Sequence, residues 1–369
     1  MRIKLGIITL LVAVTLGGCD NEPNVEPADL IFSSGAVFTS DPEQPTASAV
    51  AIRGKRIVYV GEEAGITPFV GADTRRIDIG DGLLISGLMD SHTHVFNGSF
   101  SDVGVNLSLA DTREKLQTAL EAIRDANPGS GPVYARGWQN HLFPKTGPTA
   151  LQLDDIFGDR IVILGSVDGH SRWFSSRALK EGGVDANYPD PQPGVSFFER
   201  DPLTNEPLGT GRERAGGHIA ATFIPGDRSA YQERFVTWLP RAAAAGLTGV
   251  YDAWGAAPSE QEAYEIWHSL SESGDLSIRV FGSVRETDSA DLIANQFKSF
   301  ERNFTSEMVR PEAIKLAADG VPEGHTAFLL TPYVDSSNED FGHPMISKAD
   351  MTANITTYFG ADIPVHIHA

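Results

Sequence analysis

The chain is short of cysteine and of positive charge. It has one cysteine in 369 residues, so an internal disulfide scaffold is excluded. Its 29 basic residues are outnumbered by 49 acidic ones, which gives a formal net charge of −20. An acidic surface repels phosphate groups, so we expect no nucleic acid among the partners.

Several catalytic motifs are also missing. The sequence has no Gly-x-Ser-x-Gly elbow, no Walker loop and no His-Glu-x-x-His helix. Hydrophobic residues nevertheless make up 41% of the chain, which is enough to fill a core and excludes a disordered protein. The protein classes that remain are an acidic enzyme and an acidic binding protein. The length allows one large domain or a few smaller ones.

Residues 1–18 have the pattern of an export signal. Arg2 and Lys4 precede a short apolar run, and Leu16-Gly-Gly-Cys19 resembles the bacterial lipobox. We therefore expect an exported lipoprotein with a lipoprotein signal peptide, anchored to a membrane through lipidated Cys19 and facing the periplasm or the cell exterior. Residues 19–28 would be a tether. An ordinary cleaved signal with an incidental cysteine is the alternative.

The rest of the chain divides by its pattern of apolar residues. Short alternating runs broken by turns predict a small β domain over residues 29–85. From residue 86 onward, strands alternate with helices, which is typical of parallel βαβ units. A long insertion interrupts this pattern at about 97–228, and we expect it to be irregular over 128–227 because glycine and proline are frequent. The five strands are expected to end near residues 93, 251, 282, 318 and 368.

His92 and His94 are candidate metal ligands. They are two residues apart on a predicted strand, so both imidazoles project from the same face. Imidazoles that converge on one point bind zinc well. The strand also ends there, which is where α/β barrels place their active sites. The alternative is a pair of structural histidines on a half-buried strand.

Lys315 lies in the apolar strand segment 313–318, where a lysine rarely occurs without a partner or a purpose. A desolvated lysine is more often neutral, and a neutral amine can react with carbon dioxide. A lysine that extends to solvent from the strand end is the alternative.

Further candidates lie at the last strand and in the insertion. His366 and His368 repeat the two-residue spacing, and either is a candidate third ligand. His170 lies in the insertion, where a loop could cover the site. Trp138, His170 and Trp173 are candidate residues of a substrate pocket, although a loop histidine with only local hydrogen bonds is an alternative for His170.

Taken together, these segments resemble a known family. Gly87-Leu-Met-Asp-Ser-His-Thr-His94 is similar to the first-strand metal motif of the amidohydrolase superfamily, in the family 3 branch that includes N-substituted formamide deformylase. The segments that support the resemblance are 136–138, 166–173, 315–327 and 365–369.

The resemblance implies a (β/α)8 TIM barrel beside a small composite β sandwich. It implies one or two divalent metal ions, typically zinc, bound by His92, His94 and His368, with Lys315 carboxylated as a further ligand. His366 would be the neighbouring, less certain position. The implied reaction is hydrolysis of the C–N bond of a small amide or formamide by metal-activated water.

The sequence departs from the family at its end. A closed barrel needs eight strands, and only five are found. The aspartate that serves as the family's proton shuttle would lie beyond Ala369. We therefore expect this chain to be an N-terminal fragment that is not active alone, unless a partner chain supplies the missing strands. The alternative function is a catalytically inactive, membrane-tethered lipoprotein that binds a ligand or partner in the barrel mouth.

Overall fold

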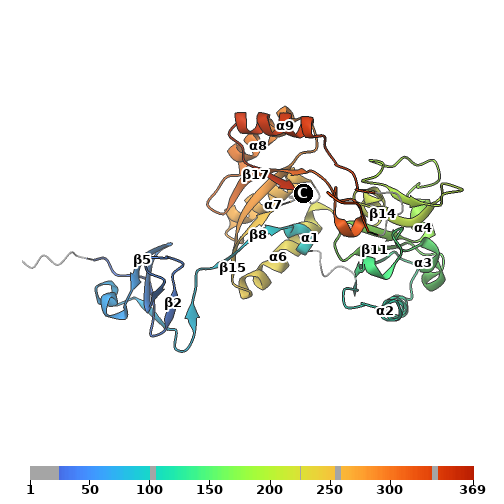
Figure 1. Cartoon of the computed structure of the whole chain (residues 1–369). Coiled ribbons are helices and arrows are strands. Elements are labelled where there is room, and N and C mark those ends of the chain that lie inside the picture. Colours follow the sequence, from blue (N-terminus) through green and yellow to red (C-terminus); the bar gives the residue numbers. More distant parts are fainter. Residues whose placement is uncertain (1–24, 100–104, 225, 254–258, 335–339) are drawn as a thin grey trace, which may run out of the picture. The chain divides into compact units, whose positions relative to one another are not determined.

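The computed structural model describes residues 25–99, 105–224, 226–253, 259–334 and 340–369 (Figure 1). The chain forms two compact units, Met1–Ser86 and Gly87–Ala369. The predicted signal, Cys19 and most of the tether lie outside the described residues. No helix in the described part of the chain is both long and apolar enough to span a membrane.

The first unit contains two small sheets. One has the strand order β5-β4-β1-β6 and the other the order β3-β2-β7. Ile31, Ala49 and Ile66 are buried in its main core. Its elements are β1 (Leu30–Ser33), β2 (Ala36–Phe38), β3 (Thr46–Ala47), β4 (Ala49–Arg53), β5 (Arg56–Gly61), the 3-10 helix η1 (Glu63–Phe69), β6 (Arg75–Asp78) and β7 (Leu83–Leu84).

The second unit is built around a five-stranded sheet of order β18-β17-β16-β15-β8, in which every pair of neighbours is parallel. The strands are β8 (Leu88–Thr93), β15 (Leu247–Asp252), β16 (Arg279–Arg285), β17 (Val309–Ala317) and β18 (Val365–His368). Four strands end within one residue of the predicted positions, and β16 ends three residues later than predicted, at Arg285. The sheet therefore has five of the eight strands that a closed barrel requires.

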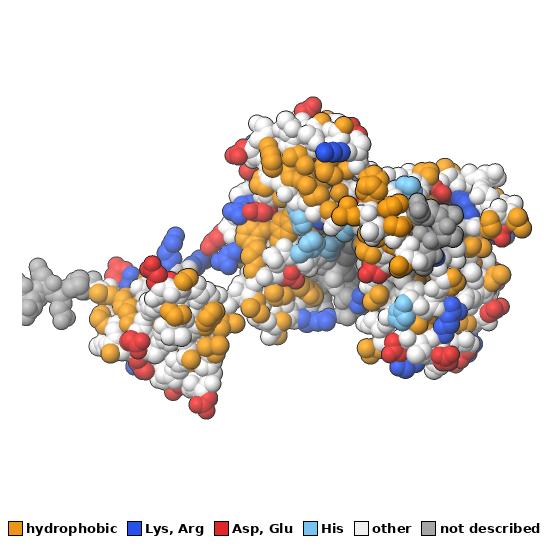
Figure 2. Space-filling model, in the orientation of Figure 1, with side chains coloured by type: hydrophobic (Ala, Val, Ile, Leu, Met, Phe, Trp, Pro, Cys, Tyr) orange, Lys and Arg blue, Asp and Glu red, His pale blue; other side chains and the backbone are white. Residues whose placement is uncertain are grey.

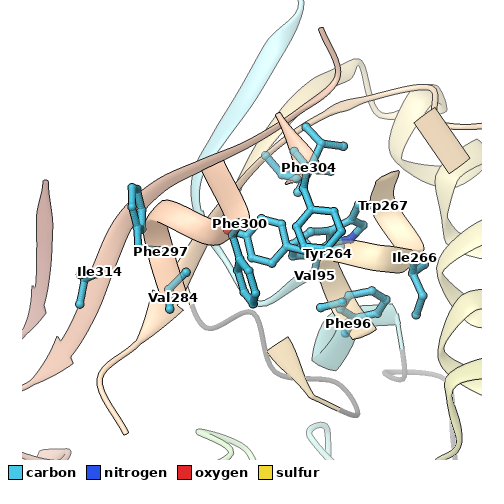
Figure 3. Close-up of a cluster of buried hydrophobic side chains, with 14 of the residues drawn as sticks. Val95, Phe96, Tyr264, Ile266, Trp267, Val284, Phe297, Phe300, Phe304 and Ile314 are labelled. Atoms are coloured by element: carbon cyan, nitrogen blue, oxygen red, sulfur yellow. The ribbon is translucent and has the colours of Figure 1, made fainter. Parts of the chain in front are cut away.

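One face of this sheet packs against a layer of helices. Phe96, Tyr264 and Trp267 are among the largest side chains of the shared core (Figure 3). Ile314 and Leu316 of β17 point into it, so Lys315 between them points to the opposite face. The helices around the sheet are α1 (Val95–Ser99), α6 (Arg228–Ala244), α7 (Glu260–Ser273), α8 (Ala290–Phe304) and α9 (Lys348–Gly360).

The helix ends follow from capping residues in the sequence. The side chains of Asp227, Ser259 and Ser347 accept hydrogen bonds from backbone N–H groups in the first turns of α6, α7 and α9. Gly246 and Gly274 follow α6 and α7 with φ near +81°, a conformation that suits glycine at a helix C-terminus.

The insertion is not irregular, which corrects the expectation for residues 128–227. It forms a six-stranded mixed sheet of order β13-β14-β12-β11-β10-β9 with two apolar cores. Its strands have only two to six residues, too few for a clear alternating pattern. Its elements are β9 (Val105–Asn106), α2 (Arg113–Ala126), β10 (Val133–Trp138), η2 (Asn140–Leu142), α3 (Ala150–Phe157), β11 (Val162–Ser166), β12 (Ser171–Phe174), α4 (Ser176–Glu181), β13 (Phe198–Arg200), β14 (Pro207–Arg212) and α5 (Gly217–Phe223).

Candidate metal centre

His92 of β8 and His94, which directly follows β8, lie side by side, as the strand spacing predicts. The ring centroids of His92 and His94 are 5.9 Å apart and the ring planes are 19° from parallel. The ring of His366 meets that of His92 edge-on at a centroid distance of 4.9 Å. The first and last strands of the sheet therefore bring imidazoles together, and Figure 2 shows histidine side chains gathered on the face in view.

Lys315 is buried, with 3% of its surface exposed. It is paired with His366 in the register of β17 and β18, and its Nζ lies 3.3 Å from His366 Nε2. Burial lowers the pKa of the Lys315 amine. The structure thus places the lysine among the histidines rather than in solvent.

His366 is a more central member of this cluster than the sequence indicated. Besides Lys315, it contacts the Tyr251 hydroxyl of β15 through Nδ1 at 3.1 Å. Burial and then the charge of Lys315 lower the pKa of His366 to about 4. Tyr251 is a cluster residue that the sequence analysis missed, because no motif marks it.

The pKa of each imidazole at the end of β8 is also lowered. Burial, followed by the charge of His92, lowers the pKa of His94 to about 4. The pKa of His92 is lowered by burial and by Lys315. Neutral imidazoles carry the lone pair that a metal ion needs.

His368 lies at the end of β18, where its ring is oriented by the backbone. Its Nε2 is 3.0 Å from the carbonyl oxygen of Gly320. Since a carbonyl can only accept, Nε2 donates and the lone pair is on Nδ1. The ring centroid of His170, from the insertion, lies 6.1 Å away.

His170 is held by Glu213, a residue that the sequence analysis missed. His170 Nδ1 lies 2.8 Å from Glu213 Oε2, and the Glu213 side chain is 8% exposed. The hydrogen bond that His170 donates to Glu213 raises the pKa of His170. The only signal in the sequence was the position of Glu213 directly after a short strand, β14.

The other two predicted pocket residues lie in the core of the insertion. Trp138 and Trp173 are 0% and 2% exposed. The Trp138 indole N–H donates to the Leu164 carbonyl and that of Trp173 to the Thr149 carbonyl. Trp173 also borders a cavity of about 190 Å³ whose lining includes none of the clustered histidines. Of the three, only His170 lies beside the cluster.

The donor chemistry of this cluster fits a divalent metal ion, because imidazoles from two strands gather beside a buried lysine. Within the described residues, no three His, Cys, Asp or Glu side chains already stand as a complete metal site. The imidazoles are instead arranged in close pairs.

Comparisons with known proteins identify relatives of this chain. The chain is 26% identical over 356 residues to exoenzymes regulatory protein AepA of Pectobacterium carotovorum subsp. carotovorum, covering 93% of this chain and 74% of that protein. It is 28% identical over 240 residues to N-substituted formamide deformylase of Arthrobacter pascens, covering 63% of this chain and 44% of the deformylase. The chain thus spans less than half of the deformylase.

A solved structure has the same fold. An uncharacterized metal-dependent hydrolase from Pyrococcus horikoshii OT3 superposes with a TM-score of 0.65 at 18% identity, covering 92% of this chain and 65% of that one. The sequence pattern of the amidohydrolase family matches residues 75–369, most of the chain. The chain therefore belongs to the amidohydrolase family and has a TIM-barrel-like α/β fold.

Proposed function

We propose that the chain is the metal-binding part of a hydrolase that cleaves a C–N bond in a small amide or formamide. The observation that carries this proposal is the meeting of His92, His366 and Lys315 at the carboxyl ends of parallel strands. This is the edge at which barrel enzymes place their chemistry. The name of one relative, a formamide deformylase, supports the class of bond.

His92, His94 and His368 are the proposed ligands, and His366 joins them as a candidate because of its contacts. A bound divalent ion such as zinc would supply a Lewis acid and lower the pKa of water. His366 and His368 contribute by holding fixed ring orientations. The Gly320 carbonyl does this for His368, and the Tyr251 hydroxyl does it for His366.

Lys315 is the proposed anionic ligand after it reacts with carbon dioxide. Its neutral amine would form an N–C bond with the carbon of carbon dioxide and release one proton to solvent, leaving a carbamate. The buried position and lowered pKa of Lys315 support this step, because both increase the neutral fraction of the amine.

Metal removal and restoration test the proposal. The natural protein in its full length is treated with a chelator, and hydrolysis of a panel of N-substituted formamides and simple amides is measured before and after zinc is returned. We expect activity to disappear and return, and the paired substitutions His92→Asn and His94→Asn to abolish it. His141→Asn, a histidine outside the cluster, is the matched control.

Two results would contradict the proposal. One is hydrolysis that survives both metal removal and the paired substitutions. The other is thermal stabilisation by an amide ligand with no turnover under any metal condition, which would indicate the alternative, an inactive binding protein.

A further inference from the structure

The insertion contacts the histidine cluster through His170, and the position of His170 is controlled by Glu213. The His170 ring lies 6.1 Å, between centroids, from the ring of His368 and is 29° from parallel to it. His170 lies in the turn between β11 and β12 and His368 is the last residue of β18, so their contact joins the insertion to the end of β18.

Glu213 holds His170 through both side chain and backbone. Its Oε2 accepts from His170 Nδ1 at 2.8 Å, and its backbone N–H donates to the His170 carbonyl at 2.7 Å. Its other carboxylate oxygen, Oε1, accepts from the Thr326 hydroxyl at 2.6 Å. The carboxylate is therefore fixed from two directions.

The backbone of Glu213 is strained. Its φ of +50° lies in the left-handed region, which non-glycine residues rarely occupy. Such conformations cost free energy and are concentrated at functional sites. Near it, a Cβ added at Gly320 would lie 2.8 Å from Glu213 Oε1 and 2.2 Å from Thr326 Oγ1, so the packing leaves no room for a larger residue.

The consequence for His170 is a defined ring orientation and tautomer. In the neutral ring the Glu213 carboxylate accepts from Nδ1, so Nδ1 carries the proton and the lone pair is on Nε2. His368 shows the same arrangement with the nitrogens exchanged, since its Nε2 donates to Gly320 and its Nδ1 keeps the lone pair. One nitrogen bonded to a carboxylate or carbonyl, with the other left as a ligand, is the usual setting of a metal-binding histidine.

We propose that His170 is an additional ligand of the metal ion and that Glu213 is its positioning residue. This inference rests on the proposed function, because it assumes that the cluster binds a metal ion. With His170 as a ligand, the metal site would be formed by residues of the insertion together with residues of the five-stranded parallel sheet.

Zinc itself is the probe, so no substrate is needed. Binding of zinc to the 369-residue chain is measured by competition with a chromogenic chelator, and cobalt absorption spectra report on the ligand set. We expect His170→Asn to weaken zinc binding at least about tenfold and to change the cobalt spectrum. Glu213→Gln should weaken binding by about tenfold, because the acceptor remains but its charge is lost.

The insertion offers matched controls. His218 bonds to the Gly182 carbonyl, and Glu199 pairs with Arg212 at 2.9 Å, and neither touches the cluster. His218→Asn and Glu199→Gln should bind zinc within about twofold of wild type. Nitrogen NMR of the wild-type chain provides a test that does not require the variants to fold: zinc should shift the His170 Nε2 resonance far more than Nδ1.

The outcomes separate this inference from the proposed function. A wild-type chain that binds neither zinc nor cobalt would overturn both. If wild type binds zinc and His92→Asn weakens that binding while His170→Asn does not, only the role of His170 is overturned. An unshifted His170 Nε2 resonance in the zinc-bound wild type leads to the same conclusion.

Discussion

Lys315 and His366 occupy paired positions on neighbouring parallel strands, with Lys315 Nζ 3.3 Å from His366 Nε2. The contact depends on the register between β17 and β18, since a shift of one residue would place Lys315 opposite an apolar side chain. This contact joins the buried lysine to the histidine cluster.

Replacing Lys315 by Met should remove metal binding while retaining the fold. The two side chains are similar in length, and an apolar replacement of a buried amine should change the free energy of unfolding by less than about 1.5 kcal/mol. Zinc competition and urea unfolding measure the two effects, with Lys298→Met on α8 as the control. Unchanged zinc affinity in K315M would show that the amine has no part in the site.

Trp138→Ala should destabilise the protein by about 3–5 kcal/mol, because the indole is fully buried in the core of the insertion. The milder Trp138→Phe should leave zinc affinity unchanged. Urea unfolding and zinc competition provide the measurements. A W138F variant of normal stability with weakened zinc affinity would contradict the assignment of Trp138 to the core alone.

Glu260 should make stability depend on pH in an unusual direction. Its side chain is 7% exposed and accepts from Arg285, but burial, the larger effect, raises its pKa. A carboxyl whose folded-state pKa is raised contributes stability below its unfolded pKa and loses it as pH rises through the folded pKa. Glu260→Gln does not titrate, so its stability relative to wild type should increase between pH 4 and pH 7.

Urea unfolding at several pH values measures this difference, and Glu301→Gln, a more exposed carboxylate on α8, should show a much smaller trend. A relative stability of E260Q that decreases with rising pH would mean that the attraction of Arg285 outweighs burial.

Cys19→Ser should release the protein from the membrane fraction and abolish incorporation of labelled fatty acid. This prediction comes from the sequence alone, because Cys19 lies outside the described residues. As a control, Glu43→Cys in the Cys19→Ser background places a thiol at an exposed site and should stay unlabelled. Fatty-acid labelling that persists without Cys19 would refute the lipoprotein assignment.

Local pattern was enough to predict the secondary structure around the parallel sheet. Alternating strands and helices are local patterns that extend over a few residues, so they can be recognised in one sequence. The pairing of His92 with His94 was predictable for the same reason, since alternate residues of a strand share a face.

The insertion shows where local pattern fails. Its short strands acquire their stability from pairing with distant segments, as β12 does with β14, so their sequences carry little periodicity. Trp138 and Trp173 were predicted for a pocket because tryptophan suits both pockets and cores, and only the packing of the sheet distinguishes the two.

The sequence by itself determined the family resemblance, the approximate strand ends, and the histidines and lysine that cluster at the carboxyl end of the parallel sheet. Only the tertiary structure placed His366 against Lys315, Tyr251 beside His366, and Glu213 behind His170. The physical reason is distance along the chain: these contacts join residues 43 to 115 positions apart, and their register and approach are set by the packing of whole sheets.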